Sequence, residues 1–176
     1  MRSSLRSLRK QLVAPTVLAS LRDSSSGSFR IAQYSVQENH LHLIVEADSK
    51  AALSTGMRGL MVRLAKRVNR LLFRRGRFWA DRWHGSALTA PRQVRNALVY
   101  VLQNRKKHVP HAARRALPSI DPLSSAEWFD GFADPIPITS RDRKPPSVVS
   151  PRTWLLRTGW RRHGLIHSSE SPRSSH

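Results

Sequence analysis

Apolar residues recur at helical spacing in two long stretches of the N-terminal half. In residues 5–22, leucines and valines return every three or four positions, and Pro15 predicts a kink or break within that helix. A longer stripe of leucine, methionine and valine ends at about Phe73. Asp48 or Ser49 stands just before that stripe and is of the type that caps a helix. Two helices are therefore predicted.

Alternating patterns predict three strands, at residues 29–36, 40–47 and 77–88, and a last helical pattern follows at 89–106. The order is helix, strand, strand, helix, strand, helix. It predicts an α+β fold, namely a ferredoxin-like antiparallel sheet with helices on one face, with its first strand missing and one helix added.

Prolines divide the chain near residue 110, because eight of the eleven lie at or after Pro118. We interpret residues 1–110 as one domain and residues 111–176 as an irregular, proline-rich C-terminal extension, partly disordered. Within the extension, two tryptophan-containing segments are expected to dock on the domain. A linker is expected at about 132–150, and disorder is expected after His167.

The charge balance indicates a polyanionic partner. Lys and Arg number 31 against 11 Asp and Glu, which gives a formal net charge of +20. Fifteen of the 31 cations lie between Ser49 and Lys107, where Asp81 is the single acid. The absence of cysteine excludes disulfides, thiolate metal sites and cysteine nucleophiles. No apolar run has the length of a membrane span and no secretory signal is recognisable, so we expect a cytoplasmic protein without a membrane partner.

Two features bear residues that can carry chemistry. His40 and His42 are two apart on a predicted strand, so their imidazoles share a face and are a plausible half of a divalent-metal site. The alternative is a pair of polar residues on a solvent-facing strand. Tyr100 and Asn104 are four apart on a predicted helix and also share a face. The alternative for Tyr100 is a core aromatic residue.

The long helix and the segment after it are the predicted nucleic-acid contact. Seven cations in fifteen residues attract phosphates strongly. Either Trp79 or Trp83 can stack on an unpaired base, although core packing is the favoured interpretation of Trp79. The predicted DNA-binding residues are Arg58, Arg63, Lys66, Arg67, Arg70, Arg74, Arg75, Arg77 and Trp83.

Three motifs in order resemble a known family. The run Gln-Glu-Asn-His-Leu-His-Leu-Ile-Val-Glu at 37–46 is similar to the histidine–hydrophobic–histidine strand of HUH-class single-strand nucleases. Within that class the chain resembles the REP-associated single-tyrosine transposases, which also have a basic helix, a Gly-Arg-aromatic segment (here 76–79) and a helix with tyrosine four residues before asparagine (here 100–104). The resemblance covers roughly residues 5–108.

The resemblance implies a mechanism and a set of site residues. His40 and His42 become ligands of Mg²⁺ or Mn²⁺, with Asn104 as the third ligand or Gln103 as its substitute. Tyr100 becomes the nucleophile that attacks a DNA phosphodiester and forms a 5′-phosphotyrosine link. The implied partner is single-stranded or hairpin DNA, bound by a monomer or homodimer at the nucleoid.

The chain also departs from that family, whose members begin with a strand before the first helix. Here four residues precede Leu5. The alternative function is therefore a catalytically inactive or N-terminally truncated nucleic-acid-binding relative. A third interpretation is a basic ribosome-associated or RNA-binding protein, in which the grouping of His40, His42 and Tyr100 is accidental.

Overall fold

A computed structural model describes residues 7–107, 118, 120–136 and 146–172 of the chain. Its described elements are the helices α1 (Ala14–Arg22), α2 (Lys50–Leu71), α3 (Pro91–Leu102), α4 (Asn104–Lys107) and α5 (Trp154–Arg157), the strands β1 (Phe29–Val36) and β2 (Leu41–Ala47), and the short 3-10 turns η2 (Ser125–Trp128) and η3 (Gly159–His163). The predicted α+β class with an antiparallel sheet is confirmed.

Strands β1 and β2 form an antiparallel hairpin in which Val36 pairs with Leu41 and Phe29 pairs with Ala47. An irregularity between Ile31 and Gln33 shifts the alternation of β1 by one residue, so that Tyr34 and Val36 share a face with Phe29 and Ile31 while Ala32 joins the other core. Every residue of β1 is buried, whereas β2 is half-buried along most of its length. The hairpin is thus covered much better on the β1 side than on the β2 side.

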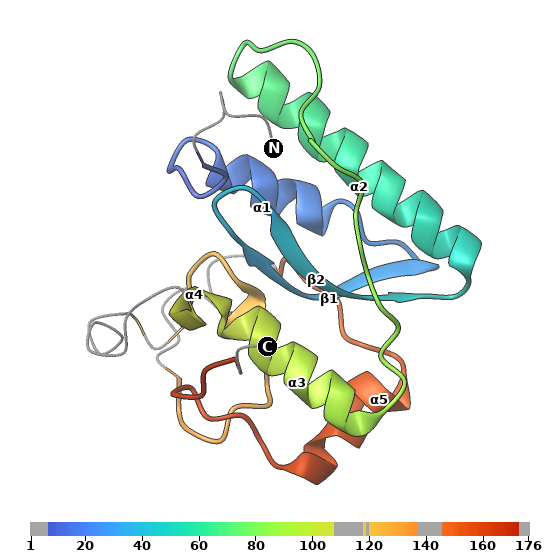
Figure 1. Ribbon diagram of the computed structural model, residues 1–176, viewed down its shortest axis with the longest axis vertical. Coiled ribbons are helices and arrows are strands. Elements are labelled where there is room, and N and C mark those ends of the chain that lie inside the picture. The colour runs from blue at the N-terminus through green and yellow to red at the C-terminus, as the bar shows by residue number, and fades with distance from the viewer. Residues whose placement is uncertain (1–6, 108–117, 119, 137–145, 173–176) are drawn as a thin grey trace.

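Helices lie on both faces of this sheet, not on one face as the sequence predicted (Figure 1). On one face, α1 and α2 pack against Phe29, Ile31 and Tyr34 through apolar stripes that include Val17 and Leu60. The other face carries α3. Its side chains share a second core with described parts of the C-terminal extension; members of that core include Ala32, Ile44, Val94, Leu98, Phe129, Leu156, Trp160 and Ile166. Helix α3 lies on this second face because the extension supplies enough apolar surface to hold it there.

The capping chemistry sets the helix boundaries. Ser49 Oγ accepts a hydrogen bond from the Ala52 N–H at 3.0 Å, so Ser49 is the cap of α2. The Ala90 N–H donates to Gln93 Oε1 at 3.2 Å, and α3 then begins at Pro91. Pro15 lies in the first turn of α1, so the helix predicted from residue 5 begins only at Ala14, and the described residues 7–13 before it are not helical.

The strand predicted at 77–88 does not form. This segment runs as irregular chain from α2 to α3 and crosses the sheet in the view of Figure 1. Its alternating pattern arises because Phe78 enters the core under α2 while Trp79 Nε1 donates to the Met61 carbonyl at 3.0 Å. The Arg77 guanidinium donates to the carbonyls of Trp79 and Ala80, which satisfies backbone oxygens that a strand neighbour would take.

The outer edge of β2 faces this segment without pairing to it. The Gln37 N–H donates to the His40 carbonyl at 2.9 Å, so alternation along the hairpin points the backbone groups of Leu41 and Leu43 away from β1. Within the described residues, no backbone hydrogen bond reaches them. On β1, by contrast, the outward N–H of Val36 donates to the Leu123 carbonyl at 2.9 Å.

The C-terminal extension packs on the domain where the structure describes it. Trp160, in η3, is 1% exposed and stacks on Phe129, with ring centroids 5.5 Å apart. The expected linker at 132–150 and the expected disorder after His167 fall partly outside the described residues.

Candidate active site

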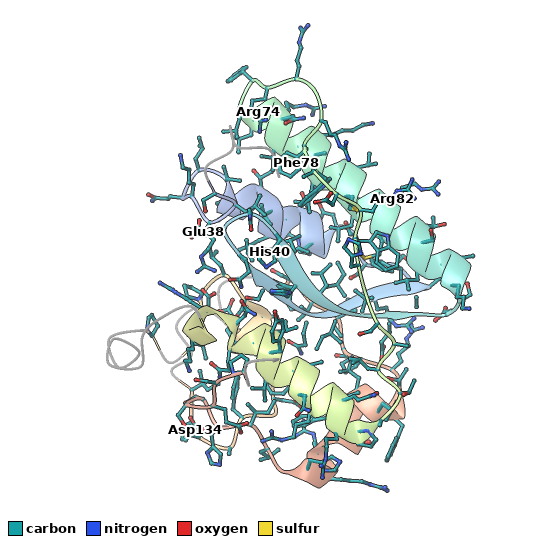
Figure 2. All side chains as sticks on the ribbon, viewed as in Figure 1. Glu38, His40, Arg74, Phe78, Arg82 and Asp134 are labelled. Atoms are coloured by element: carbon teal, nitrogen blue, oxygen red, sulfur yellow. The ribbon has the colours of Figure 1, made fainter. Side chains whose placement is uncertain are left out.

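His42 of β2 and His40, which comes just before β2, face α3. Side chains of Leu41, Leu43 and Val45 pack toward α1 and α2, so the alternation of the strand turns His40, His42 and Ile44 to the other face. Figure 2 places His40 at the end of the sheet near the hairpin turn that carries Glu38. His40 is exposed and His42 is half-buried.

The two imidazoles converge through the same ring nitrogen. His40 Nε2 lies 3.0 Å from His42 Nε2, and the ring centroids are 4.6 Å apart at an interplanar angle of 83°. His40 Nδ1 lies 2.7 Å from Asn39 Oδ1. With a proton on Nδ1 donated to that oxygen, Nε2 of neutral His40 carries the lone pair that faces His42 Nε2, and such a nitrogen can accept a proton or bind a cation.

Tyr100 joins the pair from α3. Its ring lies edge-on to His42, with ring centroids 4.9 Å apart and an interplanar angle of 77°. Tyr100 is half-buried and lines the same groove as both histidines. The structure thus brings Tyr100 to a pair of histidines that precede it by 60 and 58 positions in the sequence.

Tyr34, the other tyrosine, is placed very differently. It is 1% exposed in the core beneath α1 and α2. Burial raises the pKa of Tyr34 to about 12, although a hydrogen bond with Ser147 opposes this increase. Tyr34 therefore has neither the access nor the acidity of a nucleophile.

The amides at the end of α3 are buried. The helix ends at Leu102, and α4 begins at Asn104 after a break at Gln103, so the continuous helix predicted to 106 is interrupted there. Gln103 and Asn104 are 2% and 1% exposed. Both amide atoms of Asn104 and Nε2 of Gln103 have no hydrogen-bond partner among the described residues. The contacts that the structure gives for the imidazoles do not include either amide.

A groove of about 1980 Å³ contains the site. Its floor is β2, one wall is α2 with the 79–88 segment, and the other wall is α3. Residues of the C-terminal extension complete it; they are Thr153, Leu155, Leu156, His163, Glu170, Ser171 and Pro172. Sequence reasoning missed this contribution, because nothing local in the extension marks it as part of a site.

Glu46 holds the extension in place. It lies on the histidine face of β2, and its carboxylate accepts hydrogen bonds from the N–H groups of Arg152 and Thr153 at 2.7 and 2.8 Å and from Thr153 Oγ1 at 2.6 Å. Arg30 Nε also approaches it, at 3.3 Å. Burial raises the pKa of Glu46, but these donors outweigh burial, so the pKa lies below its usual value.

A second ion pair fixes the extension to α3. The Arg95 guanidinium donates to both carboxylate oxygens of Glu170, at 2.8 and 3.1 Å, and to the carbonyls of Gly164 and Leu165. Burial raises the pKa of Glu170, yet the hydrogen bond from Arg95 and its charge keep the pKa below the usual value. The wall formed by the extension is thus tied down at both ends.

The predicted DNA-binding cations of α2 form two groups. Arg58, Lys66 and Arg70 are exposed and recur four or eight residues apart on one stripe. Arg63 and Arg67 instead point to the end of α1, where they donate to Ser24 Oγ at 2.6 Å and Asp23 Oδ2 at 2.7 Å.

The remaining predicted contacts lie after α2. Arg75 and Arg77 are exposed and Arg74 is half-buried. Trp83 is 38% exposed and lines the groove. Trp79 packs against the core, as favoured from the sequence. Of the predicted DNA-binding residues, Trp83 alone is in the groove lining, and the exposed cations of that lining are Lys50, Arg82 and Arg92.

Two features are absent from the described part of the chain. No described helix is long and apolar enough to cross a membrane. Among the same residues, no group of three or more His, Asp or Glu side chains is placed to hold a metal ion. Any metal at the imidazole pair thus needs other donors.

Comparison with known proteins identifies the family. The family model described as "Transposase IS200 like" matches residues 8–107, which is more than half of the chain. Neither curated proteins nor solved structures gave a match. The matched range includes the histidine strand, α2 and the helix that carries Tyr100. The chain belongs to the IS200-like transposase family, whose members are DNA-processing enzymes.

Proposed function

We propose that the chain is a metal-dependent single-strand DNA endonuclease and strand transferase that acts through a 5′-phosphotyrosine intermediate. The observation that carries this proposal is the contact of Tyr100 with His42 of the imidazole pair, inside a groove whose lining includes the exposed Arg82 and Arg92. A phosphodiester seated against His40 and His42 lies within reach of the Tyr100 hydroxyl, and the exposed stripe of α2 can hold the phosphates that follow it.

Tyr100 supplies the nucleophile in this proposal. Its hydroxyl oxygen attacks phosphorus, the bond from phosphorus to the 3′ oxygen breaks, and the phenolic proton is transferred in net terms to that oxygen. The products are a 5′-phosphotyrosine and a free 3′-hydroxyl. Because the phosphodiester energy is retained in the covalent link, attack by another 3′-hydroxyl reverses the step and joins a new strand.

The residues present fit a divalent cation. His40 Nε2 and His42 Nε2, which lie 3.0 Å apart, would both hold it, because the nitrogen of a neutral imidazole is a common ligand of divalent metals. The orphaned amide of Asn104 is the proposed third donor, with Gln103 as its substitute. When bound, Mg²⁺ or Mn²⁺ would orient the scissile phosphate and offset charge on its oxygens.

The donor set also favours one ion and one order of binding. All three proposed donors are neutral, and no carboxylate joins them within the described residues. Imidazole is a softer ligand than the oxygen donors that Mg²⁺ prefers. We therefore favour Mn²⁺ over Mg²⁺ and expect tight metal binding only when a DNA phosphate adds its negative charge.

One observation favours the alternative, a nucleic-acid-binding relative without catalysis. The outer backbone edge of β2, beside Leu41 and Leu43, has no partner among the described residues. A strand that is unsupported on one side holds its side chains less rigidly than a central strand. The imidazole pair on β2 would then be placed too loosely for catalysis while the basic surface remained.

Cleavage of single-stranded DNA tests the two functions. The double variant His40→Ala/His42→Ala should lose cleavage in Mn²⁺ and keep DNA binding, because neither histidine belongs to the exposed stripe of α2. His84→Ala is the matched control, since His84 is exposed and lines the same groove. Cleavage by wild type in EDTA would contradict the metal role. Binding without cleavage by wild type would establish the alternative.

A further inference from the structure

Helix α2 ends in a turn whose middle residue is Phe73. The N–H of Phe73 donates to the Arg70 carbonyl at 3.2 Å, and the N–H of Arg74 donates to the Asn69 carbonyl at 2.8 Å. These two bonds form a Schellman motif, in which the residue after the cap takes the left-handed conformation and is usually glycine. Phe73 takes this conformation with φ 50°, and it is the one non-glycine residue with positive φ in the described part of the chain.

The side chain of Phe73 contributes almost nothing to the packing of the fold. The side chain is 97% exposed, so the ring buries almost no surface. A β-carbon in the left-handed region is also sterically disfavoured, and glycine would avoid that strain. A strained residue that contributes nothing to the core is an indication of a role outside folding.

The surroundings of Phe73 are cationic. Seven Lys and Arg and no acid lie between Arg63 and Arg77. Among them, Arg70 and Arg75 are exposed. Asn69 Nδ2 donates to the Gly76 carbonyl at 3.0 Å, which gives the loop after Phe73 a defined shape. An exposed aromatic ring among cations is the combination that binds single-stranded nucleic acid, because cations contact phosphates while the ring stacks on a base.

The position of this tip relates it to the groove. Helix α2 follows β2 after two residues and runs back along it. Its 22 residues span about 33 Å at 1.5 Å each, while the 7 residues of β2 span about 24 Å, so α2 is about 10 Å longer than the strand. Figure 2 shows this end of α2, labelled at Arg74, projecting away from α3. Phe73 thus lies outside the groove, whose lining does not include it.

We propose that Phe73 stacks on an unpaired base of single-stranded DNA outside the catalytic groove, with Arg70 and Arg75 holding the flanking phosphates. This inference rests on the DNA binding of the proposed function but does not depend on cleavage. It adds an aromatic contact that the sequence patterns did not assign.

Two variants and two probes test it. Phe73→Gly removes the ring and suits the left-handed backbone, so its melting temperature should equal or exceed that of wild type. Phe73→Trp keeps an aromatic ring. The probes are a single-stranded oligonucleotide and a strand of the same length with abasic sugars, which carries the same phosphates. Wild type should prefer the base-bearing strand, and loss of the Phe73 ring should weaken binding to that strand by about 5- to 100-fold.

The expected pattern separates stacking from charge. Phe73→Gly should reduce the preference for bases while leaving affinity for the abasic strand and the salt dependence unchanged, and Phe73→Trp should restore the preference. Leu165→Ala, which truncates another exposed apolar residue, should behave as wild type. If Phe73→Gly kept the full wild-type preference for the base-bearing strand, the stacking inference would be overturned and the proposed function would stand. An absence of DNA binding by wild type would overturn the proposed function and this inference with it.

Discussion

Replacing Arg58, Lys66 and Arg70 with alanine removes three cations from the exposed stripe of α2. None of these side chains donates a hydrogen bond to a described residue, so the fold should be unaffected. Each lost contact to a single-strand phosphate lowers the slope of log affinity against log salt by about 0.7, so three contacts lower it by about 2. The ratio of the DNA affinity of wild type to that of the triple variant should therefore fall by about 20-fold between 50 and 200 mM salt.

The assay is fluorescence anisotropy with a labelled single-stranded oligonucleotide at several salt concentrations. Arg63→Ala/Arg67→Ala is the matched control, because these cations already pair with Ser24 and Asp23 at the end of α1. Its slope should change by less than one, and stability should fall by about 0.2–1 kcal/mol per half-exposed pair. Equal slopes for wild type and the triple variant would refute the assignment of this stripe to DNA.

Three further predictions concern the walls and floor of the groove. Glu46→Gln should loosen the C-terminal extension, and acid should have the same effect on wild type. The lowered pKa of Glu46 contributes stability that is present above about pH 4.5 and is lost as the pH falls through the pKa of the folded state. Limited proteolysis at 153–172 should detect both effects. Asn104→Leu should leave stability unchanged or raise it, because it removes buried amide atoms without described partners. If this amide serves the site, thermal unfolding should show a stable protein and a cleavage assay should show an inactive one. The backbone amide of Leu43 on the outer edge of β2 should exchange with deuterium faster than that of Val36 on the outer edge of β1, and protection of Leu43 would show that a partner covers that edge.

The helices were predictable because their signals are local. Ser49 marks the start of α2, and the regular apolar stripe predicts its end at about Phe73, two residues after the observed end at Leu71. The strand predicted at 77–88 was wrong because alternation alone does not supply a neighbour for hydrogen bonding. Phe78 and Trp79 alternate for another reason, as one enters the core and the other bonds to the Met61 carbonyl.

The candidate site was predictable in part. Strand alternation placed His40 and His42 on one face, and resemblance to the family added Tyr100, which lies against His42. The contribution of the extension was not predictable, since the bond between Glu46 and Thr153 joins residues more than 100 positions apart. Asn104 stays a prediction, because the break at Gln103 alters its relation to Tyr100 and no described contact joins it to the imidazoles.

The most direct test of the central claim is the covalent adduct between protein and single-stranded DNA. Wild type incubated with an oligonucleotide and Mn²⁺ should give a species that survives denaturing electrophoresis, and Tyr100→Phe should abolish it while binding DNA normally, because the substitution removes one oxygen. Tyr34→Phe should retain the adduct, since Tyr34 is buried in the core. An adduct that persists in Tyr100→Phe, or a wild type that binds DNA and forms no adduct, would contradict the account.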